Sequence, residues 1–229
     1  MQTNNANSRG AARRFLPLVA VSVFFLAGFV VFWASDWMKL QPIATTGGLY
    51  FPWQVEIKGP HFSQGDERWA NDRLGATEES LAEAGCAVAS SAMALGALRV
   101  STDPGKLNAF LQQTPGGYTQ EGWIYWEKAA EIDPARTNNL LPHYEDLPSF
   151  FLIDWNLLKG NPVIARVRYL NGVTHFVLVC GKEGYEYLVR DPGEGGRDGL
   201  RRLSVFPGPV EALRFYRKPA RLDGEGSGA

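Results

Sequence analysis

Cys86 is the residue in this chain whose type and setting best suit nucleophilic chemistry. It follows Gly85 and precedes an alanine- and serine-rich stretch that is typical of a helix. A helix N-terminus presents unpaired N–H groups and the positive end of its dipole, which favour thiolate over thiol. The alternative is a small buried cysteine, since unpaired cysteine is among the most buried residue types. This stretch alone favours the buried cysteine, so the chemistry depends on residues elsewhere.

The second half of the chain predicts a base and an acidic residue that face each other. Runs of β-branched and aromatic residues, separated by short glycine-containing loops, predict antiparallel strands at residues 162–170, 175–181 and 185–191. The last loop has three residues and ends at Gly184, where a positive φ is required. If this loop is centred on Glu183, His175 lies opposite Asp191. Cβ atoms of opposed residues are about 4.5 to 5.5 Å apart, so this carboxylate can accept a hydrogen bond from the imidazole.

Together, Cys86, His175 and Asp191 meet the requirements of nucleophilic catalysis. A cysteine nucleophile needs a base for its proton, and the base needs a third group that fixes its tautomer and orientation. Taken singly, His175 also fits a hydrogen-bonded histidine at a strand end, and Asp191 also fits a turn. Their joint register behind a glycine–cysteine helix start favours catalysis. Cys180 falls on the opposite strand face from His175, which predicts a place in the core. A disulfide between Cys86 and Cys180 should be absent if Cys86 is catalytic.

The N-terminal segment predicts a membrane anchor. Residues 15–35 are 21 consecutive uncharged, mostly apolar positions, which is long enough to span a bilayer. A cleaved signal peptide is the alternative, but its apolar core has about 7 to 15 residues and ends in small side chains, whereas this run ends in Val-Phe-Trp-Ala-Ser. Arginines precede the run and Asp36 follows it. The positive-inside rule therefore places residues 1–14 in the cytoplasm and the globular part in the periplasm or outside a bacterial cell membrane.

Composition and metal-ligand spacing narrow the function classes. The chain has 229 residues, of which 45% are hydrophobic and 21% charged, as in ordinary globular proteins. A formal net charge of -1 argues against a nucleic-acid binder. His61 and His143 lack ligand spacing to each other, and neither Cys-x-x-Cys nor His-Glu-x-x-His occurs. We therefore expect no metal and no cofactor.

The pattern of elements predicts an α+β domain behind a tether. We expect a tether at residues 36–57, with a flexible Thr45–Gly48 and an edge strand at 53–58, a domain at 58–217 and a disordered tail at 218–229. Helices are expected at residues 78–84, 86–98, 104–113, 123–132 and 146–158. The half that carries Cys86 is thus mainly helical, and the half that carries His175 is mainly sheet.

Four stretches of the sequence resemble a known family. They are QGDERWA at residues 64–70, the segment 85–93 around Cys86, THFVLVCG at 174–181 and RDP at 190–192. They are similar to the papain-like group of the bacteriocin-processing (double-glycine leader) cysteine peptidases, and most of all to its stand-alone branch. The resemblance covers about residues 58–207. It implies a papain-like fold, and it implies that Gln64 is the oxyanion-hole donor beside the backbone N–H of Cys86.

The sequence thus predicts a membrane-anchored cysteine peptidase that faces outward and acts on a peptide or protein. A thiol acyltransferase with the same residues is the first alternative, because an amine can replace water as the acceptor. A catalytically silent domain that binds peptides or cell-envelope components is the second, although the retention of all four site residues speaks against it. Arg197, Arg201 and Arg202 are expected to form a solvated face, with the binding of an acidic substrate as the alternative.

Overall fold

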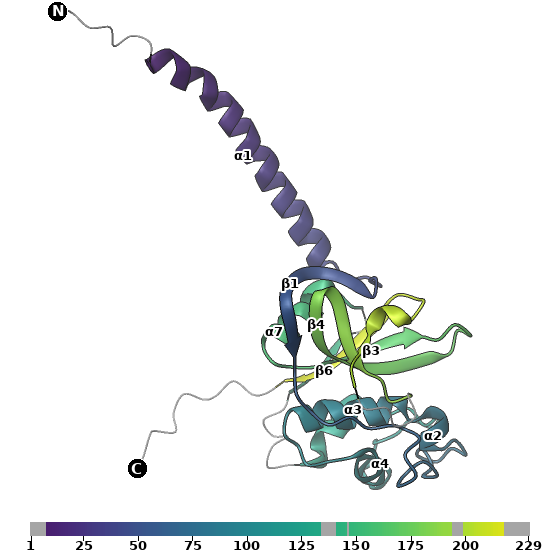
Figure 1. Ribbon diagram of the computed structural model, residues 1–229. Helices are drawn as coiled ribbons and strands as arrows, with labels where there is room; N and C mark the ends of the chain where they lie inside the picture. Colours follow the sequence, from purple (N-terminus) through teal and green to yellow (C-terminus); the bar gives the residue numbers. More distant parts are fainter. Residues whose placement is uncertain (1–7, 134–140, 146, 194–198, 218–229) are drawn as a thin grey trace, which may run out of the picture. The chain divides into compact units, whose positions relative to one another are not determined.

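The computed structural model describes residues 8–133, 141–145, 147–193 and 199–217, with side chains at 21–133, 147–193 and 199–216. The chain divides into two compact units, Met1–Lys39 and Leu40–Ala229. Residues 1–7 of the expected cytoplasmic segment lie outside the described residues. The expected disordered tail at 218–229 lies wholly outside them. Figure 1 shows the elements in chain order.

Among its described residues, the first unit contains one helix, α1 (Ser8–Met38). Its window Val21–Met38 has a mean hydropathy of 1.7, and the helix is long and apolar enough to cross a membrane. A signal sequence would have the same properties. Trp33 and Trp37 stack with ring centroids 5.6 Å apart near its C-terminal end. In membrane-spanning helices, Trp and Tyr are enriched at the level of the membrane–water interface.

The second unit begins with a strand and a helical layer. The elements after β1 (Thr46–Glu56) are α2 (Leu81–Ala84), α3 (Cys86–Ala97), α4 (Pro104–Gln113), α5 (Trp126–Ala129) and the 3₁₀ turn η1 (Ala130–Ile132). Asp103 caps α4 by accepting from the Lys106 N–H at 2.9 Å. The helix predicted from residue 123 starts only at Trp126, because Trp123 instead pairs its carbonyl with the Thr119 N–H in a turn.

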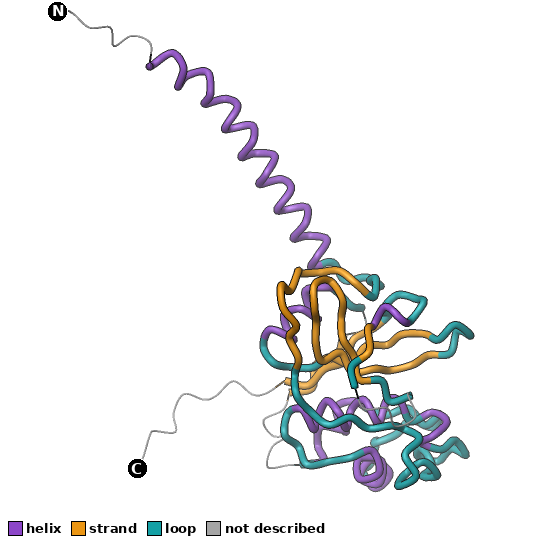
Figure 2. The backbone as a smooth tube through the Cα atoms, viewed as in Figure 1, coloured by secondary structure: helices purple, strands orange, loops and turns teal. Residues whose placement is uncertain are grey.

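The sheet is antiparallel, and all of its strands except β1 follow the helical layer in sequence. Its order is β1-β4-β3-β6-β2, with β5 beside β4. The elements are β2 (Leu141–Glu145), α7 (Phe150–Leu158), β3 (Val163–Arg168), β4 (Thr174–Arg190), β5 (Arg201–Arg202), the 3₁₀ turn η2 (Leu203–Val205) and β6 (Ala212–Arg217). Figure 2 shows that most helices gather on one side of the strands. The predicted α+β organisation is confirmed.

The two sheet faces bury two separate apolar cores. Ile164, Leu178 and Cys180 point toward α3 and the other helices of the helical layer. Val163 and Val179, one position away, point toward α7. Successive strand residues face opposite sides, so a sheet covered on both faces reads as a nearly continuous apolar run. On the helical side, the small residues of α3 allow close packing, and residues 88–95 are all buried.

β4 differs from the two strands predicted at 175–181 and 185–191. Strand hydrogen bonding continues through residues 182–184, so one long, bent strand replaces them. β1 pairs with this region, and its partners include Lys182 and Gly184. This additional neighbour satisfies backbone groups that a free hairpin loop would expose. Gly184 has φ +58, so the predicted positive φ is confirmed.

The expected tether is also corrected. Pairing with the domain begins at Gln41, whose N–H donates to the Pro148 carbonyl at 2.9 Å, and Ile43 bridges to Val210. Residues 46–56 form β1, so the edge strand starts earlier than predicted. The sequence predicts a flexible segment at Gly47 and Gly48. In the structure their positive φ values of 135° and 70° allow the β1 backbone to approach α7 closely. A Cβ on either residue would collide with Phe150 or Asp154.

A buried charged cluster joins β1, α7 and β4. The Lys182 ammonium donates to Asp154 Oδ1 at 2.6 Å and to the Gly47 carbonyl at 2.6 Å. Asp154 also accepts from the Tyr187 hydroxyl at 2.9 Å and from the Leu49 N–H at 2.7 Å. Both ionic side chains are fully buried. Burial lowers the pKa of Lys182, and the Asp154 carboxylate opposes that shift.

Candidate active site

Cys86 is the first residue of α3, as the sequence predicts. Gly85 is both the C-cap of α2 and the N-cap of α3. Its N–H donates to the Leu81 carbonyl at 2.8 Å, and its carbonyl accepts from the Ala89 N–H at 2.9 Å. A Cβ on Gly85 would collide with the Leu81 carbonyl, so only glycine fits this junction. Cys86 is a half-buried free thiol. The junction presents it at a helix N-terminus, where the dipole favours a negative charge.

His175 and Asp191 lie together at the two ends of β4. The His175 Nε2 atom donates to Asp191 Oδ1 at 2.7 Å. The two residues are only 2% and 1% exposed, so little water competes for this hydrogen bond. The contact expected from the strand register is therefore present, although the strands differ from those predicted. It leaves Nδ1 of the imidazole for a partner on the other side.

The electrostatics tie Cys86 to this pair. Burial alone would lower the pKa of His175, but hydrogen bonds with Asp191 and Cys86 raise it to about 9. Burial would raise the pKa of Asp191, but His175, the Gly193 N–H and Arg201 hold it below its usual range. At neutral pH an imidazole with a pKa of about 9 is protonated.

Aromatic rings fix the plane of the imidazole. Tyr169 lies over His175 with ring centroids 4.5 Å apart and planes tilted by 30°, and the Phe206 ring lies 5.9 Å away. Gly193 closes the remaining side, since a Cβ there would come 3.2 Å from His175 Cε1 and would collide with the Tyr169 hydroxyl. The imidazole therefore has little freedom to rotate, which is what a positioned general base requires.

Gln64 lies beside the segments that carry Cys86 and Asp191. Its Nε2 donates to the Ala82 carbonyl at 2.8 Å, and its backbone N–H donates to the Pro192 carbonyl at 2.9 Å. Ala82 belongs to α2, which ends directly before Cys86, and Pro192 follows Asp191. The amide NH₂ has two hydrogens, so one remains for another acceptor. In the part of the chain with described side chains, the buried Oε1 has no hydrogen-bond partner.

Arg201 and His61 contact Asp191, and neither contact is predicted from the sequence. Arg201 donates to Asp191 Oδ2 at 2.6 Å, which corrects its expected place on a solvated face. His61 Nε2 lies 3.1 Å from the Asp191 carbonyl. Arg202 is exposed, as predicted, and Arg197 lies outside the described residues. No sequence signal marks Arg201, because its contact depends on the pairing of a two-residue strand with β4.

Cys180 and His143 lie outside the candidate site. Cys180 is fully buried in the core, as predicted, and burial raises the pKa of its thiol to about 11. Neither Cys86 nor Cys180 is in a disulfide. Among the residues whose side chains are described, no three His, Cys, Asp or Glu side chains are grouped as metal ligands. His143 is on β2, and its side chain lies outside that set.

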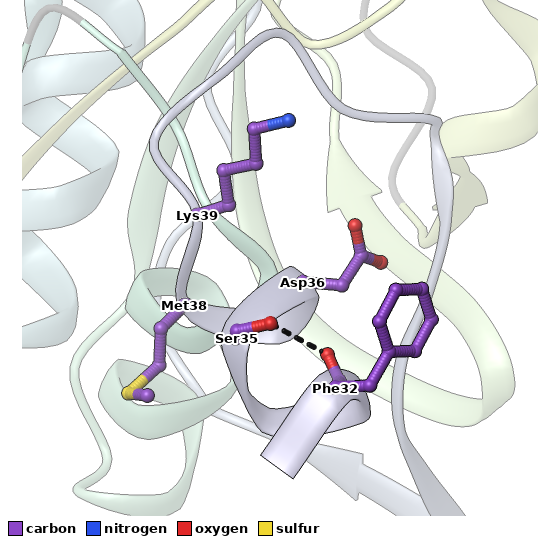
Figure 3. A pocket seen from close by; sticks show the side chains of 5 residues that line it. All are labelled: Phe32, Ser35, Asp36, Met38 and Lys39. Carbon is purple, nitrogen blue, oxygen red and sulfur yellow. Dashed lines mark hydrogen bonds between the residues drawn. The ribbon is translucent and has the colours of Figure 1, made fainter. Parts of the chain in front are cut away.

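A separate hollow lies at the C-terminal end of α1 (Figure 3). It has a volume of about 410 Å³ and is lined by Phe32, Ser35, Asp36, Met38 and Lys39. The Ser35 hydroxyl donates to the Phe32 carbonyl at 2.8 Å, as in an ordinary helix turn. Phe32 and Met38 are exposed, so this is an open surface hollow. It contains none of the candidate catalytic residues.

The chain is similar in structure to a solved protein structure. No protein-family model matches the chain, and no curated protein matches it. Among solved structures, the chain is similar to a protein from Bacillus anthracis described as a "putative C39-like peptidase". The similarity covers 74% of this chain and 100% of that one, with 16% sequence identity and a TM-score of 0.46.

Proposed function

We propose that this chain is a cysteine peptidase of papain-like fold, with Cys86 as nucleophile, His175 as general base and acid, and Asp191 as the group that orients His175. One observation carries the proposal. The buried His175 imidazole is hydrogen-bonded to Asp191, interaction with Cys86 helps to raise its pKa, and Cys86 begins the buried helix α3. Nucleophile, base and orienting group are the three parts that covalent catalysis by cysteine requires.

The chemistry follows from these positions. The Cys86 thiolate attacks the carbonyl carbon of a peptide bond, and the bond to sulfur forms as the carbonyl oxygen becomes an oxyanion. The His175 imidazolium gives its proton to the leaving amine, and the C–N bond breaks to leave an acyl-enzyme. Neutral His175 then takes a proton from water, which attacks the thioester and releases the acid. In this scheme Asp191 stays ionised and keeps Nε2 protonated throughout.

Gln64 and the backbone N–H of Cys86 are proposed to stabilise the oxyanion. The hydrogen bonds of Gln64 to Ala82 and to the residue after Asp191 support this role, because they hold the amide between the two segments that carry the candidate triad. Donors fixed in advance need no reorganisation when the charge develops. A thiol acyltransferase would use the same residues, with an amine in place of water as the acceptor of the acyl group.

Thiol labelling tests the central assignment. Iodoacetamide reacts with thiolates, so Cys86 should be alkylated at pH 6 well before Cys180, whose pKa burial raises to about 11. Below pH 9 the His175 imidazole keeps its proton and supports the thiolate. Mass spectrometry of the peptides that carry the two cysteines measures both rates in one sample, with Cys180 as internal control. Equal and slow labelling of both thiols would remove Cys86 as the nucleophile.

Replacing Gln64 by alanine should lower kcat by roughly 10² to 10³ and leave KM nearly unchanged, because an oxyanion donor acts mainly in the transition state. Gln112 is a matched control: its side chain also donates to a backbone carbonyl, that of Arg73, at 2.6 Å on the exposed surface. Gln112→Ala should keep the wild-type kcat. Steady-state kinetics on a cleaved peptide measures both variants. An unaltered kcat in Gln64→Ala would exclude Gln64 from the site and leave the triad standing.

We further propose that α1 anchors the enzyme in a bacterial cell membrane, with the catalytic unit on the periplasmic or outer side. The length and mean hydropathy of α1 support a membrane span, and the arginines in its first turns, before the apolar stretch, support a cytoplasmic N-terminus. The thiol labelling above extends to this question. A membrane-impermeant maleimide added to spheroplasts should label Cys86, whereas labelling only after lysis would reverse the orientation.

A further inference from the structure

Asp191 is held at both carboxylate oxygens. Oδ1 accepts from His175 Nε2 at 2.7 Å and from the Gly193 N–H at 2.9 Å, while Oδ2 accepts from the Arg201 guanidinium at 2.6 Å. The carboxylate is 1% exposed, and the Arg201 side chain is 34% exposed. A nearly buried carboxylate needs such partners, since burying an ionised group without them is costly. One oxygen thus serves the imidazole and the other serves the arginine.

The sheet brings Arg201 to this point. β5 pairs with β4 so that Arg201 lies opposite Val189, two residues before Asp191. Side chains two residues apart on a strand share a face, so Arg201 projects on the side of the strand that carries Asp191. The next residue, Arg202, pairs with Leu188 and projects to the other side. Arg202 is exposed, and it carries the same charge on the neighbouring residue but projects away from Asp191.

We propose that Arg201 is a positioning residue that acts on the catalytic site through Asp191. It fixes the rotation of the carboxylate so that Oδ1 faces the imidazole, and its positive charge limits how strongly the carboxylate holds the imidazolium proton. The proposal rests on the function proposed above and adds to it a residue that orients Asp191 and slightly adjusts the upper pH limit of the site.

The effect of Arg201 on the rotation of the Asp191 carboxylate follows from side-chain torsions. The terminal torsion of aspartate is broad, so a carboxylate whose hydrogen bonds all go to one oxygen can turn more freely than one held at both oxygens. A charge-assisted hydrogen bond from arginine to Oδ2 is roughly twice as strong as a neutral one and fixes that torsion. Loss of Arg201 therefore leaves His175 with a less constrained partner. The imidazole would present Nδ1 to Cys86 in a smaller fraction of molecules.

The second part follows from the sign of the charges. A cation near Asp191 offsets part of the negative charge that stabilises the imidazolium. Removing Arg201 should raise the pKa of His175 above its value of about 9. Because Arg201 is about one third exposed, solvent screens this effect, and the shift should be well under one pH unit. A lysine at this position would keep the charge but would lose the planar fork of the guanidinium.

The test compares Arg201→Ala, Arg201→Lys and Arg202→Ala in the full chain. The readout is the rate of Cys86 alkylation by iodoacetamide as a function of pH, together with peptide turnover. In Arg201→Ala we expect turnover to fall roughly tenfold, about the effect of one hydrogen bond to a charged group. The alkaline step of the alkylation profile should move to higher pH. Arg201→Lys should keep the wild-type position of that step, and Arg202→Ala should match the wild type in both readouts.

The outcomes separate the two proposals. A wild-type pH profile and wild-type turnover in Arg201→Ala, with Cys86 still the fast-reacting thiol, would overturn the role of Arg201 alone. Reduced turnover with an unshifted alkaline step would also overturn it, because a merely structural arginine would act in that way. If Cys86 reacts no faster than Cys180 in the wild-type chain, the proposed function itself fails.

Discussion

Cys86→Ala is expected to abolish turnover of every peptide that the wild-type chain cleaves, because no neighbouring group can form the thioester in its place. His175→Ala should come close to the same loss, since members of a triad act as a unit. Asp191→Asn should be milder, because the amide oxygen can still accept from His175 Nε2. The measurement is the release of products from a peptide library by the purified chain, with and without added amines.

Cys180→Ala is the matched control for the nucleophile. Cys180 is the other cysteine of the chain, and it lies in the core away from His175. This variant should be somewhat less stable but should still cleave peptides. Full activity of Cys86→Ala would refute the enzyme proposal. Amide products formed with the added amines, in place of free acids, would identify an acyltransferase.

Asp154→Ala is expected to lower the free energy of unfolding by about 3 to 5 kcal/mol. It removes the carboxylate that neutralises a fully buried Lys182, and breaking one side of a buried ion pair typically costs that much. It also leaves the Tyr187 hydroxyl and the Leu49 N–H without their acceptor. Equilibrium unfolding in urea measures the effect. Glu131→Ala, which removes a solvent-exposed ion pair with Lys128, should change the free energy by under about 1 kcal/mol.

The double variant Asp154→Leu/Lys182→Met isolates the cause of that loss. Replacing both partners of a buried ion pair by apolar side chains is often neutral or stabilising, because no uncompensated charge remains. We therefore expect the double variant to be clearly more stable than Asp154→Ala. If the two variants were equally unstable, lost packing and lost hydrogen bonds to β1 would explain the effect, and the charge would not.

Much of the candidate site could be predicted from the sequence because its signals are local. A glycine before Cys86 and small residues after it indicate the start of a buried helix, and that helix is present at Cys86–Ala97. The spacing of His175 and Asp191 around a short glycine loop is enough to bring their side chains together. Both inferences use only neighbours along the chain and the fixed periods of helix and strand.

The tertiary structure decided what depends on segments far apart in sequence. Gln64 was assigned by resemblance, and only the folded chain brings it beside Ala82 and Pro192. The glycines of β1 pack against α7, and this packing fixes the position of the strand. From the sequence alone, the same glycines indicate a flexible tether. The partners of Lys182 and Arg201 also come from other elements of the fold, and a charged residue looks solvated in sequence until its partner is known. Sequence periods specify elements and their faces, whereas long-range packing specifies which charges meet.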